Sequence, residues 1–216
     1  MLLDIHISEK TIGVNKIIDN LNLVINSNGI YGIVGKNGTG KTTLFKCILG
    51  IESYSGLNNS FEKMNLRNTC WCPTETYLYE DLTVNEFYRF YDKLMNINLE
   101  DERILVFKDI PLDIQIKNLS TGMRKKMFLN ALFQKSYKYY ILDEPFNGLD
   151  LEANFILWNY IKKISGDSLI LVSSHILDSL VKNCEAIFVL KNEGGKYFSS
   201  NQFNQIEDFL FKSIKI

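Results

Sequence analysis

A clear excess of either charge is missing from this sequence. Its 24 lysine and arginine residues nearly balance its 25 aspartate and glutamate residues, and the formal net charge is −1. A domain that binds nucleic acid through its overall field is strongly basic, so the composition gives no support for a nucleic-acid partner. The short basic run at residues 124–126 is more simply interpreted as the solvated face of a helix.

Long apolar runs are also missing. No stretch approaches the roughly 18–20 apolar residues that cross a bilayer. The first residues, to Ile7, alternate between apolar and polar like a strand and lack the basic start of a signal peptide. We therefore expect a cytoplasmic chain.

Cysteine is scarce, and its spacing does not match the common zinc motifs. Cys70 and Cys72 are separated by one residue, and no second group of cysteine and histidine residues completes a zinc site. Since these two cysteines lie two positions apart on a predicted strand, their thiols are expected on the same face. We expect all four cysteines, with Cys47 and Cys184, to be free and partly buried.

The most informative stretch present is a glycine-rich loop after an apolar run at residues 30–34. It fits the phosphate-loop pattern G-x-x-x-x-G-K-[ST] and reads Gly35-Lys36-Asn37-Gly38-Thr39-Gly40-Lys41-Thr42. Glycines allow backbone N–H groups to converge on a phosphate chain, and the following helix adds the positive end of its dipole. A chance glycine-rich turn is the alternative, but strand, loop and helix follow in the order that the motif requires.

Specific roles follow for the side chains at the end of this loop. Lys41 is expected to reach the β- and γ-phosphates, and the Thr42 hydroxyl to bind Mg²⁺. Thr43 is placed to contact the α-phosphate.

Two later apolar strands end in polar residues. Residues 139–142 lead into Asp143 and Glu144, and residues 169–173 lead towards His175. In phosphate-loop enzymes a strand-end carboxylate holds the metal, which fits Asp143, while Glu144 could orient or deprotonate the attacking water. Adjacent acids at a strand end are also common as solvated turn residues, but the upstream phosphate loop favours the catalytic interpretation.

The segment Leu119-Ser120-Thr121-Gly122-Met123 opens a long predicted helix at residues 121–134. Taken alone, it is an ordinary helix N-cap. It is also a candidate second anion site, because helix N-termini attract negative charge.

The order of the predicted elements indicates an α/β fold with a largely parallel sheet. Thr83 and Glu86 form a capping-box pattern at the start of a helix. The predicted strands lie at residues 2–8, 20–25, 30–34, 57–61, 69–72, 139–142, 169–173 and 186–190, followed by a hairpin through Gly194-Gly195 to Phe198. The predicted helices lie at 42–49, from 83, weakly at 101–108, at 121–134, 151–164 and 176–181, and from about Gln202.

Taken together, these motifs resemble those of the ATP-binding subunits of ABC transporters over nearly the whole chain. Residues 35–42 resemble the family's Walker A motif, residues 139–143 its Walker B motif, and Glu144 its catalytic glutamate. Residues 119–123 resemble the LSGGQ signature in the form LSTGM. Residues 147–150, with Asp150, resemble the D-loop, and His175 the switch histidine.

The resemblance implies one ABC-type ATPase domain over residues 1–216, with a phosphate-loop (RecA-like), mainly parallel sheet core. An N-terminal antiparallel β subdomain and a short helical insert at about residues 83–135 complete the expected fold. ATP and Mg²⁺ are the implied ligands, and Lys41, Glu144 and His175 the implied catalytic residues.

The resemblance also implies partners. Two subunits, identical or related, close over two ATP molecules, so that Ser120, Thr121 and Gly122 contact the γ-phosphate held by the partner's phosphate loop. Asp150 lies at the seam of that dimer. A separately encoded membrane permease would hold the pair at the cytoplasmic face of the membrane and would choose the cargo.

The LSTGM form and the run at residues 144–150 are similar to bacterial exporter ATPases, which implies export. The alternative is a soluble ABC-type ATPase that acts on nucleic acid or ribosomes. DNA-repair members carry long coiled-coil insertions and translation members carry two cassettes in one chain, and neither feature is present in this sequence.

The resemblance is incomplete at two positions. The position of the metal-binding glutamine of the Q-loop falls on Thr74, with Glu75 beside it. Either the contact with the metal is indirect, or Glu75 takes the place of the glutamine, or this loop has relaxed requirements. The aromatic residue that stacks on adenine falls on Ile12, and such stacking is worth ~1–3 kcal/mol per base. We therefore expect weaker nucleotide binding or a relaxed base preference.

Overall fold

A computed structural model describes residues 2–58, 67–76, 78–97, 103–191 and 194–211. The strands are β1 Leu3–Ile12, β2 Asn15–Ile25, β3 Gly29–Val34, β4 Ser55–Asn58, β5 Thr69–Cys72, β6 Tyr139–Leu142, β7 Leu169–Ser173, β8 Ala186–Lys191 and β9 Gly194–Ser199. The helices are α1 Lys41–Ile48, α2 Val84–Leu94, α3 Thr121–Leu132, α4 Leu151–Ile164, α5 Leu177–Asn183 and α6 Ile206–Phe211. Two 3₁₀ turns cover Ile116–Asn118 and Ser200–Gln205.

A mixed sheet forms the centre of the molecule. Within the described residues its strand order is β5-β6-β7-β3-β8-β9, with the first five strands parallel and β9 antiparallel to β8. A second sheet, in the order β2-β1-β4, is antiparallel. The prediction of a parallel core with an N-terminal antiparallel part is therefore confirmed.

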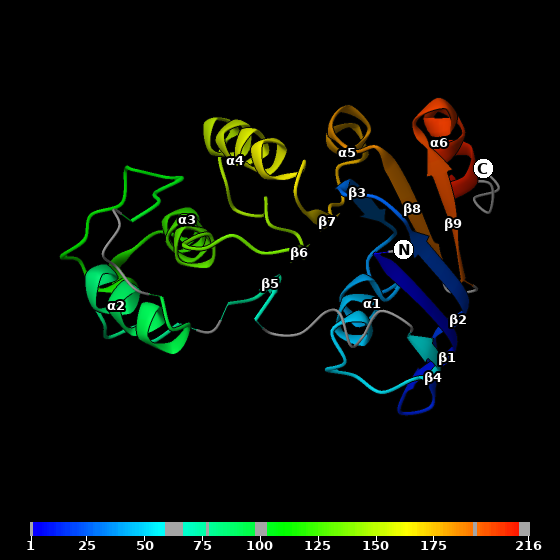
Figure 1. The fold of residues 1–216 in the computed structure, drawn as a ribbon, viewed down its shortest axis with the longest axis horizontal. Coiled ribbons are helices and arrows are strands. Elements are labelled where there is room, and N and C mark those ends of the chain that lie inside the picture. The colour runs from blue at the N-terminus through cyan, green and yellow to red at the C-terminus, as the bar shows by residue number, and fades with distance from the viewer. Residues whose placement is uncertain (1, 59–66, 77, 98–102, 192–193, 212–216) are drawn as a thin grey trace.

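Both faces of the mixed sheet are buried, which explains its nearly continuous apolar strands. On β6, Tyr140 and Leu142 belong to one hydrophobic cluster, and Tyr139 and Ile141 to the other. Figure 1 shows α4, α5 and α6 on one side of the sheet, and α1 with the antiparallel strands on the other. Successive side chains of a strand point to opposite faces of the sheet, so each strand contributes to both hydrophobic cores.

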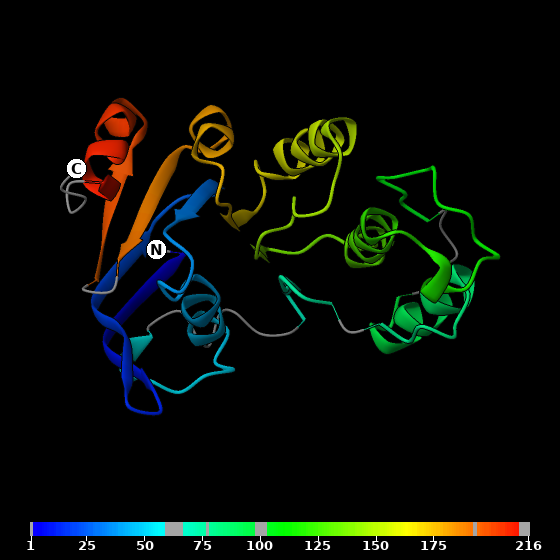
Figure 2. The same cartoon turned by 180° about the vertical axis from the view of Figure 1, so that it is seen from behind.

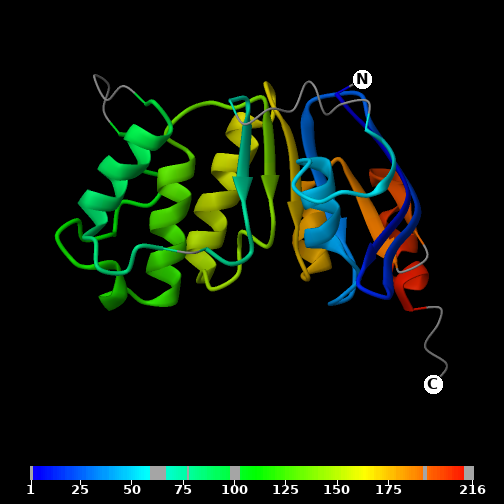
Figure 3. The same cartoon turned by 90° about the horizontal axis from the view of Figure 1, so that it is seen from below.

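Helices α2 and α3 lie together at one end of the molecule, and α6 with the antiparallel strands lies at the other (Figure 1, Figure 2). Figure 3 shows α2 and α3 side by side at the end of the sheet whose edge strand is β5. The buried Asn130 of α3 donates to the Tyr88 hydroxyl of α2 at 3.2 Å and to the Phe107 carbonyl at 2.8 Å. These bonds satisfy a buried amide and tie the two helices together.

The start of α2 follows the predicted capping box. The Thr83 hydroxyl accepts from the Glu86 backbone N–H, and the Glu86 carboxylate accepts from the Thr83 backbone N–H. This reciprocal pair stabilises the exposed first turn of the helix.

Several predicted elements differ in the structure. The strand predicted at 2–8 extends to Ile12 as β1, and the strand predicted at 20–25 already begins at Asn15 as β2. Residues 103–108 contain no helix, so the weak helix predicted at 101–108 is wrong over its described part. The strand predicted at 57–61 appears as β4 at Ser55–Asn58, and the remainder lies outside the described residues. The last helix begins at Ile206 after a 3₁₀ turn, four residues later than predicted.

None of the helices in the described part of the chain is long and apolar enough to span a membrane.

Candidate functional site

Four neighbouring strands end at the same edge of the mixed sheet and carry the polar residues of the site there. In the order β5-β6-β7-β3, they lead into Thr74, into Asp143 with Glu144, into His175 after the strand-end Ser173, and into the glycine-rich loop. The register aligns Cys72 with Leu142, and Leu142 with Val172. Since ligands of open parallel sheets bind outside the carboxyl ends of the strands, this edge is the expected site.

The loop between β3 and α1 has the backbone of a phosphate-binding turn. Gly38 and Gly40 have φ values of +83° and +93°, a region that side chains with a Cβ rarely adopt. A Cβ on Gly40 would also lie 2.7 Å from the Ile17 side chain. Lys41 begins α1, and its ammonium group donates to the Gly35 carbonyl at 2.9 Å.

The Asp143 carboxylate is fully buried and accepts three hydroxyl hydrogen bonds. Thr42 and Thr74 each donate to its Oδ2 at 2.6 Å, and Ser173 donates to its Oδ1 at 2.6 Å. A buried carboxylate requires such donors to offset its lost hydration. The clustered carboxylate and hydroxyl oxygens are also the hard ligands that Mg²⁺ prefers, so Thr42 and Asp143 fit a magnesium site, with Thr74 bonded to the same carboxylate.

Glu144 points away from Asp143 towards the phosphate loop. Its backbone is left-handed, with φ +46°, and its N–H donates to the Ser173 hydroxyl at 2.8 Å. Its carboxylate lies 3.9 Å from the Lys41 ammonium and 3.1 Å from Nδ1 of His175. The unusual backbone therefore directs two consecutive carboxylates to different partners.

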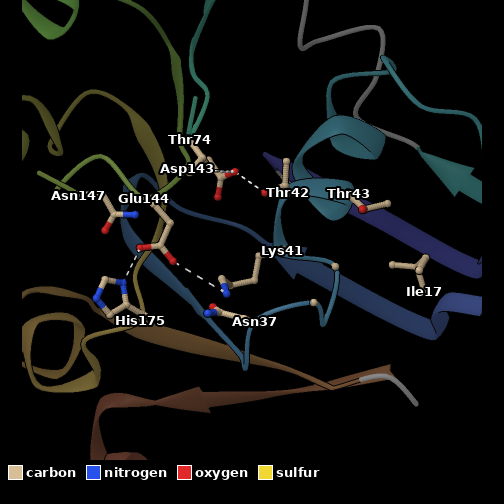
Figure 4. A pocket seen from close by; sticks show the side chains of 12 residues that line it. Ile17, Asn37, Lys41, Thr42, Thr43, Thr74, Asp143, Glu144, Asn147 and His175 are labelled. Carbon is tan, nitrogen blue, oxygen red and sulfur yellow. Dashed lines mark hydrogen bonds and ion pairs between the residues drawn. The ribbon is translucent and has the colours of Figure 1, made fainter. Parts of the chain in front are cut away.

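These side chains surround a cavity of about 590 Å³ (Figure 4). Figure 4 shows Glu144 between Lys41 and His175, with Asp143 and Thr42 beside them. The cavity is lined by Ile17, Asn37, Gly38, Gly40, Lys41, Thr42, Thr43, Thr74, Asp143, Glu144, Asn147 and His175. Most of the predicted loop residues thus come together with the acidic and histidine residues, whereas Gly35, Lys36 and Thr39 of the loop do not line the cavity.

A second group of predicted residues lies outside this cavity. Among the described residues, Ser120, Thr121, Gly122 and Asp150 do not line it. Ser120 caps α3 by accepting from the Met123 N–H at 3.3 Å, and Asp150 caps α4 by accepting from the Ala153 N–H at 2.8 Å. The Ala153 N–H lowers the pKa of the exposed Asp150 carboxyl.

The starts of α3 and α4 are packed against each other. An added Cβ on Gly122 would lie 2.7 Å from the Gly148 carbonyl oxygen, and Lys126 lies 3.7 Å from Asp150. The structure therefore joins these predicted residues into a second polar cluster.

The basic run at residues 124–126 is not the solvated helix face that its composition suggests. Arg124 donates to Glu80 and to the Lys117 carbonyl, and Lys126 pairs with Asp109 at 2.7 Å. Lys125 is only 6% exposed, and its ammonium group donates to the Pro73 carbonyl at 3.4 Å. These three cations hold separate segments onto α3.

The cysteines are free and buried, as predicted, and none of them lines the cavity. Cys70 and Cys72 both face the same hydrophobic cluster. Burial raises the pKa of the Cys72 thiol, and the nearby Lys125 opposes this rise. These thiols therefore act as small apolar side chains.

Sequence reasoning missed or misplaced some residues of the site. It did not assign a role to Ser173, whose hydroxyl links Asp143 with Glu144, although its position two residues before His175 could have suggested one. The family's adenine-stacking position falls on Ile12, which does not line the cavity, whereas Ile17 does. At the Q-loop position Thr74 lines the cavity, whereas the exposed Glu75 does not.

Comparison with protein families places most of the chain in one group. The family model described as "ABC transporter" matches residues 18–147. "ABC transporter G family member 20" of Dictyostelium discoideum is 31% identical over 199 residues, which cover 83% of this chain and 27% of that protein. The "ABC-type transporter ATP-binding protein EcsA" of Bacillus subtilis is 27% identical, over 82% of this chain and 78% of that protein.

The chain thus spans about a quarter of the Dictyostelium relative and most of the Bacillus one. Among solved structures, an ATP-binding subunit of an ABC transporter is similar with a TM-score of 0.83 and 24% identity, over 97% of this chain and 94% of the other. An ATP-binding cassette solved in its ADP conformation gives a TM-score of 0.75 at 17% identity, over 98% and 97% of the two chains. These likenesses establish the fold.

Proposed function

The chain belongs to the ABC transporter family, whose ATP-binding subunits are ATPases, and we propose that it binds and hydrolyses ATP to drive transport through a separate membrane subunit. The observation that carries this proposal is the placement of Glu144 between Lys41, at 3.9 Å, and His175, at 3.1 Å, above the phosphate loop. The cargo is left open, because it would be chosen by the membrane subunit.

Glu144 has the properties of a general base. It is 8% exposed and lies within hydrogen-bonding reach of His175, which can hold the carboxylate in place for a water molecule. Lys41 now faces this carboxylate, and a bound γ-phosphate would take over as its counter-charge. Phosphate binding would thereby free Glu144 to accept a proton from the attacking water.

Magnesium would be held by Thr42 and Asp143, whose side chains already meet at 2.6 Å. When bound, Mg²⁺ supplies positive charge that neutralises the phosphate oxygens as the terminal bond breaks. The protein's own part is to keep the Asp143 carboxylate oriented through its hydroxyl donors.

A second ATPase subunit, identical or related, is part of the proposal. Ser120, Thr121 and Gly122 lie outside the cavity of their own chain and are free to approach that of another. The first turn of α3 can bind an anion through its N–H groups, which suits the exposed face of a γ-phosphate held by the partner. Asp150, packed with this cluster through Lys126, would then lie at the seam of the dimer.

The proposed partner in the membrane is a separately encoded permease, with the ATPase pair bound at its cytoplasmic face. Export is the proposed direction, since the LSTGM motif and residues 144–150 resemble exporter ATPases. The helical insert at residues 83–135 would face this permease.

The variant Glu144→Gln tests the ATPase proposal. An amide cannot accept the proton from water, so we expect steady-state ATP turnover to fall by at least ~100-fold while ATP binding persists. With ATP, the variant should also elute as a dimer in size-exclusion chromatography. Without nucleotide, it should elute as a monomer. Turnover is measured by phosphate release.

Glu207→Gln provides the matched control, because Glu207 is exposed on α6 and lies outside the cavity. It should behave like the wild type in turnover and in dimer formation. Undiminished hydrolysis by Glu144→Gln would refute the assignment of Glu144 as the general base.

A further inference from the structure

Thr74 contacts the proposed metal site in a way that its short side chain did not suggest. Its hydroxyl donates to Oδ2 of Asp143 at 2.6 Å, the same oxygen that accepts from Thr42 at 2.6 Å. Two hydroxyls from different elements thus meet on one carboxylate oxygen (Figure 4). The third donor, Ser173, occupies Oδ1.

These contacts restrict the carboxylate as well as stabilise it. Asp143 is 0% exposed, so its charge depends on the donors that surround it. Hydrogen bonds from hydroxyls to an ionised carboxylate are short and strong, and three donors in different directions fix the rotation of the group. Removing Thr74 would free one side of the oxygen that also meets Thr42.

The backbone at residues 72–74 is itself held in place. The Cys72 carbonyl accepts from the Asp143 N–H at 2.8 Å, and the Pro73 carbonyl accepts from the buried Lys125 ammonium at 3.4 Å. The Pro73 ring further restricts the chain immediately before Thr74. The Thr74 hydroxyl is therefore presented to Asp143 from a rigid support.

We propose that Thr74 is a positioning residue that orients Asp143 for Mg²⁺ through its hydroxyl. This role would replace the direct metal contact of the Q-loop glutamine that the family resemblance implies at this position. Glu75 has no part in it, because its side chain does not line the cavity, whereas that of Thr74 does and contacts Asp143. The inference rests on the proposed ATPase function and adds Thr74 to Asp143 and Ser173 as residues outside the phosphate loop that shape the metal site.

The experiment titrates Mg²⁺ against the full-length protein with a non-hydrolysable ATP analogue and follows the thermal unfolding midpoint. Outer contacts to metal ligands are typically worth 10–100-fold in metal affinity. We therefore expect Thr74→Val to need about tenfold more Mg²⁺ for half of the stabilisation. In excess EDTA, the variant and the wild type should bind the analogue equally well.

Three further variants separate positioning from packing. Thr74→Ser keeps the hydroxyl and should restore the wild-type Mg²⁺ midpoint. Thr69→Val makes the same substitution on β5, where the hydroxyl donates to Asn68 rather than to the site, and should also match the wild type. Glu75→Gln should have no effect if the exposed carboxylate plays no part.

A wild-type midpoint for Thr74→Val would overturn the inference, and so would an equal shift for Thr74→Ser. A shift with Glu75→Gln alone would assign the metal contact to Glu75. If the wild type itself showed no stabilisation by the analogue with Mg²⁺, the proposed function would fail and not only the role of Thr74.

Discussion

At the scale of single residues, the site depends on two adjacent carboxylates that serve different partners. Asp143 turns towards three hydroxyls, while Glu144 turns towards Lys41 and His175. The left-handed backbone at Glu144, with φ +46°, produces this separation, and the Ser173 hydroxyl contacts both residues. Such strain persists only where the surrounding contacts hold it, and it is typical of functional sites.

Ile17 is expected to contribute to nucleotide binding without selecting between adenine and guanine. It lines the cavity beside Gly40, and an aliphatic side chain can cover a base face but cannot distinguish adenine from guanine by its edges. Ile17→Ala should weaken binding of ATP and GTP alike, by about 1 kcal/mol or roughly fivefold in Kd. Equilibrium binding of fluorescent ATP and GTP analogues measures both values.

Ile12→Ala is the matched control, because Ile12 is 51% exposed and lies outside the cavity. It should leave both affinities unchanged. A loss of ATP binding with GTP binding unaffected would show that Ile17 selects the base, contrary to this expectation.

The sequence could predict the charged and glycine residues of the site, because their spacing follows from a known phosphate-binding geometry. It could not predict which hydroxyls would reach Asp143. Thr74 and Ser173 lie 69 and 30 positions away from it in the chain, and only the pairing of β5, β6 and β7 brings them together. Ile17 was missed for a similar reason, since its approach to Gly40 depends on how β2 packs against the loop.

At the scale of elements, the first turn of α3 is fitted against the segment that precedes α4. The Gly122 position has no room for a Cβ, which would lie 2.7 Å from the Gly148 carbonyl oxygen. The Gly148 backbone, with φ +81°, turns the chain into Asp150 and the start of α4. A glycine at residue 122 thus sets how closely the two helix starts approach.

Gly122→Ala should therefore destabilise the protein and displace these two segments. Overpacking against a backbone atom typically costs about 1–3 kcal/mol. Urea denaturation monitored by circular dichroism measures the change in unfolding free energy. ATP-dependent dimer formation should weaken in parallel, because the displaced turn carries Ser120 and Thr121.

Gly166→Ala is a suitable control, since an added Cβ there would meet no atom within 4 Å. Its unfolding free energy should stay within about 1 kcal/mol of the wild type. An unchanged stability for Gly122→Ala would mean that the two helix starts can separate without cost.

Element prediction succeeded where hydrophobic period and caps agreed. The Thr83 capping box and the apolar spacing placed α2 correctly, and the strand runs of the mixed sheet were recovered within a residue or two. It failed at residues 103–108, where apolar side chains such as Phe107 are buried by packing against α3 in irregular backbone. Burial there is supplied by tertiary contacts, which local periodicity does not record.

At the scale of the whole molecule, the proposed nucleotide site and the proposed contact with the permease lie in different places. The cavity lies at the edge of the central sheet, whereas α2 and α3 lie together at one end of the molecule (Figure 3). There α2 carries two exposed apolar side chains, Phe90 and Leu94. Phe90 and Leu94 are one helical turn apart on α2, and the Tyr79 ring meets the Phe90 ring edge-on at 5.2 Å. This group suits contact with the proposed permease, because an exposed apolar cluster favours a partner.

Recovery of membrane proteins by the Glu144→Gln variant tests the proposal for the complete assembly. Tagged protein is captured with ATP from detergent-solubilised membranes of its host, and the bound proteins are quantified. We expect one polytopic membrane protein in near-equal amount, because the variant should remain in the ATP-bound dimer. Adding Leu94→Glu should reduce this recovery at least tenfold, whereas Phe211→Glu, at the opposite end on α6, should not. Recovery of ribosomes or nucleic acid in place of a membrane protein would favour a soluble ABC-type ATPase.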